Sequence, residues 1–174
     1  MSMLNEMPPQ IFCTDNETFE FRQIKDIITW VVPNKPNTGL WTSSALTDSP
    51  FLSPWQEWCA NNDYHCGVHH FSLIPKTNLK VFEPDSLSDL RTIEPELPLL
   101  PPSIDFAWYA REGYNGFHVS DRILNLPSDD IHPFHGWDCE STVWFNYDWI
   151  SSFKKISCIP RFSMLYSEHK LCMK

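Results

Sequence analysis

Short apolar runs divided by prolines and polar turns predict a chain of short strands with a few short helices. Strand character is clearest where β-branched and aromatic residues dominate a run. Such runs cover residues 10–14, 40–44, 68–74, 79–82, 115–120 and 141–146. We expect 68–74 and 79–82 to pair as a hairpin, because the turn-prone residues 75–78 connect them.

Helices are predicted where a capping residue precedes a helix-compatible segment. Ser53 can cap, and Pro54 can open, a helix that continues to about Asn61. Residues 85–90 predict a short helix, and Ser103 is expected to cap another that ends before Gly113. Residues 24–31 stay open between helix and strand, because their apolar spacing is helical and their composition β-branched. Residues 121–136 predict a polar loop.

The length of 174 residues and a hydrophobic share of 42% suit one domain with a sizeable core. Strands and helices that do not alternate regularly predict the α+β class. Residues 151–174 carry five cationic residues and one anionic residue, a charge of +4. Because the whole chain has a net charge of −9, the preceding residues carry −13. We therefore expect a body over 1–150 and a basic extension over 151–174 packed on it.

The acidic balance limits the classes of partner. A net charge of −9 and a pI near 5.1 argue against direct binding to nucleic acid or to an anionic membrane surface. No apolar run approaches the ~20 residues that a membrane helix needs. The first ten residues lack the pattern of a signal peptide, so we expect six free cysteines and a cytoplasmic location.

Histidines and cysteines gather in two loops and raise the question of zinc. The first loop holds His65, Cys66, His69 and His70, and the second holds His132, His135 and Cys139. Their spacing is irregular for a zinc finger or ribbon, and only one of His69 and His70 can face a common site from a strand. The sequence therefore favours no metal site. Cysteine catalysis is disfavoured too, because Asp138 and Glu140 would raise the pKa of the Cys139 thiol.

Six spaced motifs resemble a group of small phage and bacterial proteins. In chain order they are Lys35-Pro36 with Gly39-Leu40-Trp41-x-Ser43, Trp55-x-x-Trp58-Cys59, Ser86-x-x-Asp89-Leu90, Ile104-Asp105-Phe106, Tyr114-Asn115-Gly116-Phe117 and Gly136-Trp137-Asp138-Cys139-Glu140-Ser141. This group in turn resembles the ADP-ribosyltransferase fold. The resemblance covers about residues 35–150 and implies two small packed β-sheets with short flanking helices and a ligand cleft between them.

The resemblance also implies a ligand and site residues. The ligand is NAD or a related nucleotide, and the implied binding residues are Gly39, Leu40, Trp41, Thr42, Ser43, Ser44, Trp55, Tyr114 and Arg122. Cleavage of the bond between nicotinamide and ribose passes through an oxocarbenium-like transition state, which needs a nearby carboxylate. Asp138 and Glu140 are the candidates and would share a face if they lie in a strand. Ser141 is the third candidate, because the register of the family's closing strand can place it at the carboxylate position.

Two departures from the family pattern keep a second function open. The first is that Ser141, rather than Glu140, falls at the usual carboxylate position if the register follows the family's closing strand. The second is that the polar NAD anchor of the first strand would align near Phe12 or Cys13, so Arg22 or Arg122 would have to replace it. The first function is transfer of ADP-ribose to a macromolecule. The alternative is a catalytically degenerate phage-type protein that binds and inhibits a basic host defence protein, through surface carboxylates such as Asp121, Asp129 and Asp130.

Overall fold

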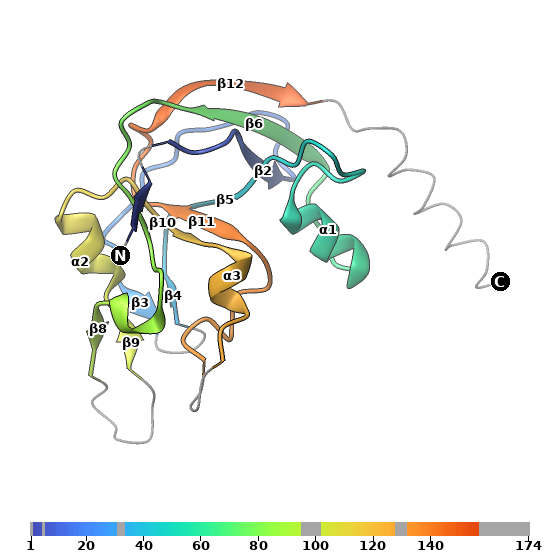
Figure 1. Cartoon of the computed structure of the whole chain (residues 1–174). Coiled ribbons are helices and arrows are strands. Elements are labelled where there is room, and N and C mark those ends of the chain that lie inside the picture. Colours follow the sequence, from blue (N-terminus) through green and yellow to red (C-terminus); the bar gives the residue numbers. More distant parts are fainter. Residues whose placement is uncertain (1, 5, 31–33, 95–101, 128–131, 157–174) are drawn as a thin grey trace.

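Eight strands form one mixed sheet in the computed structural model (Figure 1), which describes the chain except residues 1, 5, 31–33, 95–101, 128–131 and 157–174. Across the sheet the strands are β1 (Ser2–Leu4), β7 (Val81–Glu83), β10 (Gly116–Val119), β11 (Ser141–Trp144), β5 (Leu40–Ser44), β2 (Gln10–Thr14), β6 (His69–Pro75) and β12 (Ile150–Ile156). Neighbours are antiparallel, except that β7 and β10 are parallel. With its short helices the chain is one α+β domain.

The two halves of this sheet are continuous, which differs from the expected pair of packed sheets. β2 pairs with β5 through only two residue pairs, Gln10 with Ser44 and Ile11 with Ser43. On its other edge β5 pairs with β11, and on its other edge β2 pairs with β6. This narrow junction includes Ser43, the last residue of the motif at residues 39–43, so the candidate site lies where the two halves join.

The expected hairpin of β6 and β7 is wrong. β6 lies between β2 and β12, and β7 lies between β1 and β10. The reason is visible in the connection between them: Lys76 N donates to Trp149 O at 2.7 Å, and Asn115 N donates to Lys80 O at 2.8 Å. The chain therefore leaves β6 toward the start of β12 and enters β7 beside the start of β10.

Three α-helices, a 3-10 helix and two small two-stranded sheets complete the described residues. The helices are α1 (Pro54–Asn61), α2 (Phe106–Arg111), α3 (Asp121–Leu124) and the 3-10 helix η1 (Leu87–Asp89). The small sheets pair β3 (Thr29–Trp30) with β4 (Lys35–Pro36) and β8 (Thr92–Ile93) with β9 (Ser103–Ile104). Residues 29–30 of the ambiguous segment 24–31 therefore form a strand, and residue 31 lies outside the described residues. α3 occupies the start of the expected loop, and Asp129 and Asp130 lie outside the described residues.

The caps explain where the helices begin. Ser53 accepts a hydrogen bond from Gln56 N at 3.4 Å, which confirms the predicted start of α1. α2 begins later than predicted, because Ser103 belongs to β9 and Asp105 is the cap, accepting from Trp108 N at 2.9 Å. Gly113, at φ +78, ends that segment as expected. No helix in the described part of the chain has the length and apolar character to cross a membrane.

The sheet is covered by apolar residues on both faces. Neighbouring residues of one strand enter different cores: Phe82 and Val143 pack in one cluster, and Val81 and Trp144 in the other. This follows from the alternation of side chains along a strand. β12 begins at Ile150, so the expected boundary between 150 and 151 falls inside a strand of the main sheet.

Candidate functional site

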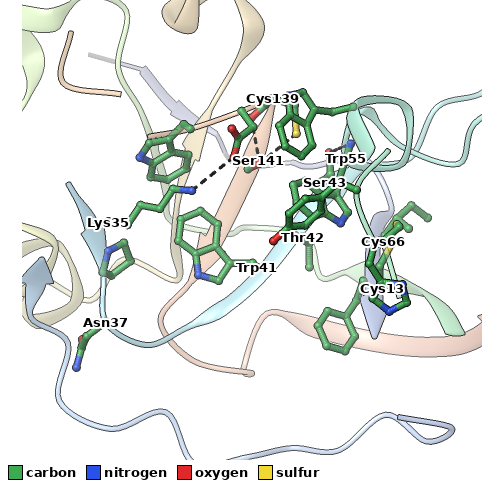
Figure 2. Close-up of a pocket in the computed structure, with 18 residues that line it drawn as sticks. Cys13, Lys35, Asn37, Trp41, Thr42, Ser43, Trp55, Cys66, Cys139 and Ser141 are labelled. Carbon is green, nitrogen blue, oxygen red and sulfur yellow. Dashed lines mark hydrogen bonds and ion pairs between the residues drawn. The ribbon is translucent and has the colours of Figure 1, made fainter. Parts of the chain in front are cut away.

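A cavity of about 810 Å³ lies beside the sheet junction (Figure 2). Segments far apart in the sequence form its walls: β2, the end of β4, β5, α1 with the following loop, and the residues that lead into β11. The lining residues are Ile11, Phe12, Cys13, Lys35, Pro36, Asn37, Trp41, Thr42, Ser43, Trp55, Trp58, Tyr64, His65, Cys66, Trp137, Asp138, Cys139 and Ser141. Its volume falls in the range of small-molecule sites, roughly 300–1,000 Å³.

Aromatic rings supply much of the cavity wall. Trp55 and Trp58 are stacked, with ring centroids 5.4 Å apart and planes 11° apart, and Tyr64 meets both rings edge-on. On the other wall Trp41 packs against Trp137 at 4.8 Å. Trp55 and Trp58 lie one helical turn apart on α1, which explains their parallel rings. Rings that remain partly exposed in a cavity can stack on a flat ligand.

Lys35 and Asp138 form an ion pair at the cavity. Lys35 Nζ is 3.8 Å from Asp138 Oδ2 and 5.5 Å from the centre of the Trp41 ring. Asp138 is the one carboxylate among the described residues that line the cavity. Lys35 belongs to the Lys35-Pro36 motif, but no role could be assigned to it from the sequence, because its position depends on the pairing of β4 with β3.

Glu140, the other candidate carboxylate, is buried behind the cavity wall. Its Oε2 lies 2.7 Å from Ser43 Oγ and 2.9 Å from Ser44 N, and its Oε1 accepts from Ser44 Oγ at 2.7 Å. His118 Nδ1 lies 3.5 Å from the same carboxylate. Asp138 and Glu140 both precede β11, so the strand condition for a shared face is not met, and only Asp138 lines the cavity.

The polar contacts around Glu140 continue through the sheet. Thr42 Oγ1 donates to Gln10 Oε1 at 2.6 Å and accepts from Trp144 Nε1 at 2.7 Å. Gln10 Nε2 lies 3.3 Å from Ser44 Oγ, which itself contacts Glu140. The hydroxyls of Thr42, Ser43 and Ser44 thus belong to a hydrogen-bond network that joins β2, β5 and β11.

The remaining predicted residues lie at the cavity, in the core or at the surface. Trp41, Thr42, Ser43, Trp55 and Ser141 line the cavity, whereas Ser44, Tyr114 and Arg122 do not. Tyr114 is buried in the core with Lys80 Nζ 4.2 Å from its ring centre, and Arg122 contacts Asp85 on the outside of α3. Gly39 is needed for the backbone, because its φ is +134 and a Cβ there would lie 2.6 Å from Val143 Cγ2.

A smaller cavity of about 380 Å³ adjoins the first and shares Phe12 and Trp41 with it. Gly39, Leu40 and Arg22 line this second cavity, where Arg22 also pairs with Glu20 at 3.3 Å. Of the two arginines considered from the sequence, Arg22 therefore shares a cavity with Phe12, whereas Arg122 lines neither cavity. Sequence spacing alone could not separate the two arginines.

The cysteines at the cavity lie in two places, with Cys139 before β11 and with Cys13 and Cys66 on the side of β2. Burial chiefly, and then the neighbouring carboxylates, raise the pKa of Cys139 to about 12, in the direction predicted from its neighbours. Such a thiol is a poor nucleophile. Among the described residues, His132, His135 and Cys139 do not form a metal-binding group, whereas Cys66 lies close to Cys13, which the sequence did not connect with it.

Comparisons with known proteins return no family: no family model, no curated protein and no solved structure matches this chain.

Proposed function

We propose that the larger cavity binds NAD or a related nucleotide. The observation that carries this proposal is the combination of two aromatic walls, one from β5 and one from α1, with the ion pair of Lys35 and Asp138, which is partly exposed to solvent. Flat heteroaromatic rings stack on tryptophan, and polar groups at the edge of the cavity then fix their orientation. An acidic protein gains such affinity from stacking rather than from net charge.

The polar residues suit the rest of a nucleotide. Lys35 supplies a positive charge within reach of the Trp41 ring, whereas the side-chain amide of Asn37 is already bonded to Ile28 N and Asp26 O. The adjoining smaller cavity holds Arg22, and the two cavities share Trp41. A dinucleotide that extends past Trp41 would use both, with its pyrophosphate near the cationic side chains.

Transfer of ADP-ribose, as in the ADP-ribosyltransferases that the sequence resembles, would rest on Asp138. A carboxylate at the cavity can stabilise positive charge that develops on the ribose. Glu140 does not line the cavity, and its oxygens already accept hydrogen bonds from Ser43 and Ser44. In this proposal Asp138 acts on the substrate and Glu140 positions the strand end that carries Ser43.

Binding without turnover is the second candidate. It is favoured by the pairing of Asp138 with Lys35, which already uses the one carboxylate among the described lining residues. In that case the protein acts by binding a basic host protein, and the cavity serves as a ligand pocket or as part of the interface.

Ligand binding is tested by calorimetric titration of the full chain with NAD, ADP-ribose and nicotinamide mononucleotide. Trp41→Ala should weaken binding by about 10-fold or more, because stacking of a base on an aromatic side chain is worth ~1–3 kcal/mol. Trp108→Ala is the matched control, since both tryptophans are partly buried against the same core cluster and Trp108 does not line the cavity. Equal affinities in the two variants would place the ligand elsewhere.

Turnover is tested by following release of nicotinamide from NAD, with and without a protein acceptor. Asp138→Asn should reduce the rate by roughly 100-fold or more, as expected for loss of an electrostatic stabiliser. Asp148→Asn, an equally conservative change of an exposed aspartate outside the cavity, should leave the rate unchanged. NAD binding with no turnover in the unmodified protein would favour the second candidate.

A further inference from the structure

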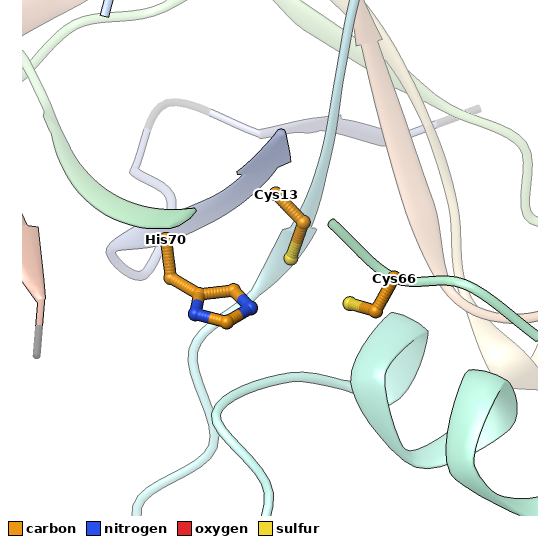
Figure 3. A group of neighbouring side chains, drawn as sticks. All are labelled: Cys13, Cys66 and His70. Atoms are coloured by element: carbon orange, nitrogen blue, oxygen red, sulfur yellow. The ribbon is translucent and has the colours of Figure 1, made fainter. Parts of the chain in front are cut away.

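Two thiols and one imidazole converge at the edge of the cavity (Figure 3). The sulfur atoms of Cys13 and Cys66 and a ring nitrogen of His70 all lie within 4.8 Å of one another. They come from three parts of the chain: β2, the loop after α1, and β6. Cys13 and Cys66 are partly buried and line the cavity, and His70 is buried.

The fold fixes this convergence at the backbone. Cys13 and His70 are directly opposite each other in the β2–β6 register, so their side chains stand on the same face of the sheet. Cys66 is brought to them by Gly67, which adopts φ +97 and lies so close to β2 that a Cβ would be 2.7 Å from Thr14 N. Only a glycine lets the loop approach the strand in this way.

A second anchor holds the same loop against β2. His65 Nε2 lies 2.7 Å from Asp15 Oδ1, and Val68 N donates to the same oxygen at 3.3 Å. Residues on both sides of Cys66 are therefore fastened to the turn that follows Cys13.

We propose that Cys13, Cys66 and His70 bind one Zn²⁺ ion, with the fourth position open toward the cavity. Two thiolates and an imidazole form a ligand set typical of zinc. In a tetrahedral site with Zn–S bonds of ~2.3 Å the sulfur atoms stand ~3.8 Å apart, so the three ligand atoms need to close in by about 1 Å or less. The inference stands independently of nucleotide binding.

The fourth position is open because Cys59, the other thiol close to Cys66, lies away from the cavity. Cys59 on α1 is buried beside Cys66, but it does not belong to the group of ligand atoms that lie within 4.8 Å of one another. Cys59 does not line the cavity, whereas Cys13 and Cys66 do. The ion would thus have three protein ligands and one exchangeable position, the arrangement of zinc sites that contact a substrate or water.

The experiment uses the full chain, reduced with a phosphine, freed of metal with a chelator and titrated with Zn²⁺ against a chromophoric competitor. One equivalent should bind, and Co²⁺ in its place should show the thiolate charge-transfer and intense visible bands of a tetrahedral site. Cys66→Ser and Cys13→Ser should each weaken binding by about 100-fold or more, since losses of this size follow even from disturbing residues behind the ligands. The Co²⁺ spectrum tests the unaltered protein, should a variant fail to fold.

Two cysteines serve as controls. Cys139→Ser changes a thiol at the same cavity outside the group and should leave the affinity for Zn²⁺ unchanged. Cys59→Ser should weaken binding less than threefold; a loss as large as that of Cys66→Ser would overturn the open position. An octahedral Co²⁺ spectrum, or zinc affinity unaffected by Cys13→Ser and Cys66→Ser, would overturn the site.

Discussion

Glu140 is a carboxylate whose surroundings at the residue scale favour a role in holding the strand end. Ser43 Oγ, Ser44 N and Ser44 Oγ surround its two oxygens at 2.7–2.9 Å, and the side chain is largely buried. From the sequence, Glu140→Gln would change only the charge of a candidate catalytic group. In the structure it also replaces an acceptor oxygen with an amide donor inside a closed network.

We therefore expect Glu140→Gln to lower the free energy of unfolding by about 1–3 kcal/mol, the cost of weakening charge-assisted hydrogen bonds to a buried group. Asp138→Asn, two residues away and exposed, should change it by less than about 0.5 kcal/mol. Urea unfolding of both variants measures the difference. Equal midpoints for the two variants would mean that the Glu140 network contributes nothing to stability.

Site residues could be predicted from the sequence where a motif lies on one strand. Trp41, Thr42 and Ser43 line the cavity because β5 forms as expected and runs along it. Tyr114 and Arg122 do not line it, because Tyr114 precedes β10 and packs in the core, and α3 turns Arg122 outward toward Asp85. Cys13 and His70 could not be connected from the sequence, since their contact depends on the β2–β6 register.

Gly67 is decisive at the scale of the elements, because it joins the loop after α1 to the end of β2. Gly67→Ala combines an unfavourable positive φ with a Cβ 2.7–3.0 Å from the Thr14 backbone, which cannot move aside without disturbing β2. Gly113→Ala offers a matched control: its φ is +78, but the added Cβ would meet nothing within 4 Å. The two variants share the conformational cost and differ in the clash.

Gly113→Ala should cost about 1 kcal/mol, and Gly67→Ala at least about 2 kcal/mol more. Thermal and urea unfolding give both values. If Gly67→Ala were no less stable than Gly113→Ala, the close approach of the loop to β2 would be wrong.

Individual strands and α1 could be predicted from local pattern, but the strand pairing could not. Residues 10–14, 40–44 and 53–61 follow their propensities and caps. The order of the sheet depends on partners that are distant in the sequence. Trp149 O accepts from Lys76 N at one end of the 76–80 connection, and Asn115 N donates to Lys80 O at the other end. A short turn-prone segment therefore suggested a hairpin that tertiary hydrogen bonds prevent.

At the scale of the whole molecule, several buried groups stay protonated to high pH. Burial raises the pKa of Cys59 and Cys139 from 9.0 to about 12, and that of Tyr109 from 10.0 to about 12. As pH rises above 9, the unfolded chain loses these protons before the folded chain does. Stability should therefore be fully present below about pH 9 and decline up to about pH 12.

Cys139→Ala makes this prediction specific. Removing one buried thiol should make the decline of unfolding free energy between about pH 9 and pH 12 shallower, by up to the contribution of one proton. Urea unfolding of the unaltered chain and the variant across this range measures it. An identical slope for the two proteins would contradict the assignment of Cys139 as a buried, protonated thiol.

The central claim, that the cavity at the sheet junction binds a nucleotide, is tested most directly by a crystal structure of the protein with NAD. The account predicts density for a flat ring stacked on Trp41 or between the walls of Trp41 and Trp55, with the ribose beside Asp138. No density in the cavity at saturating NAD, or a nucleotide bound on another surface, would contradict it.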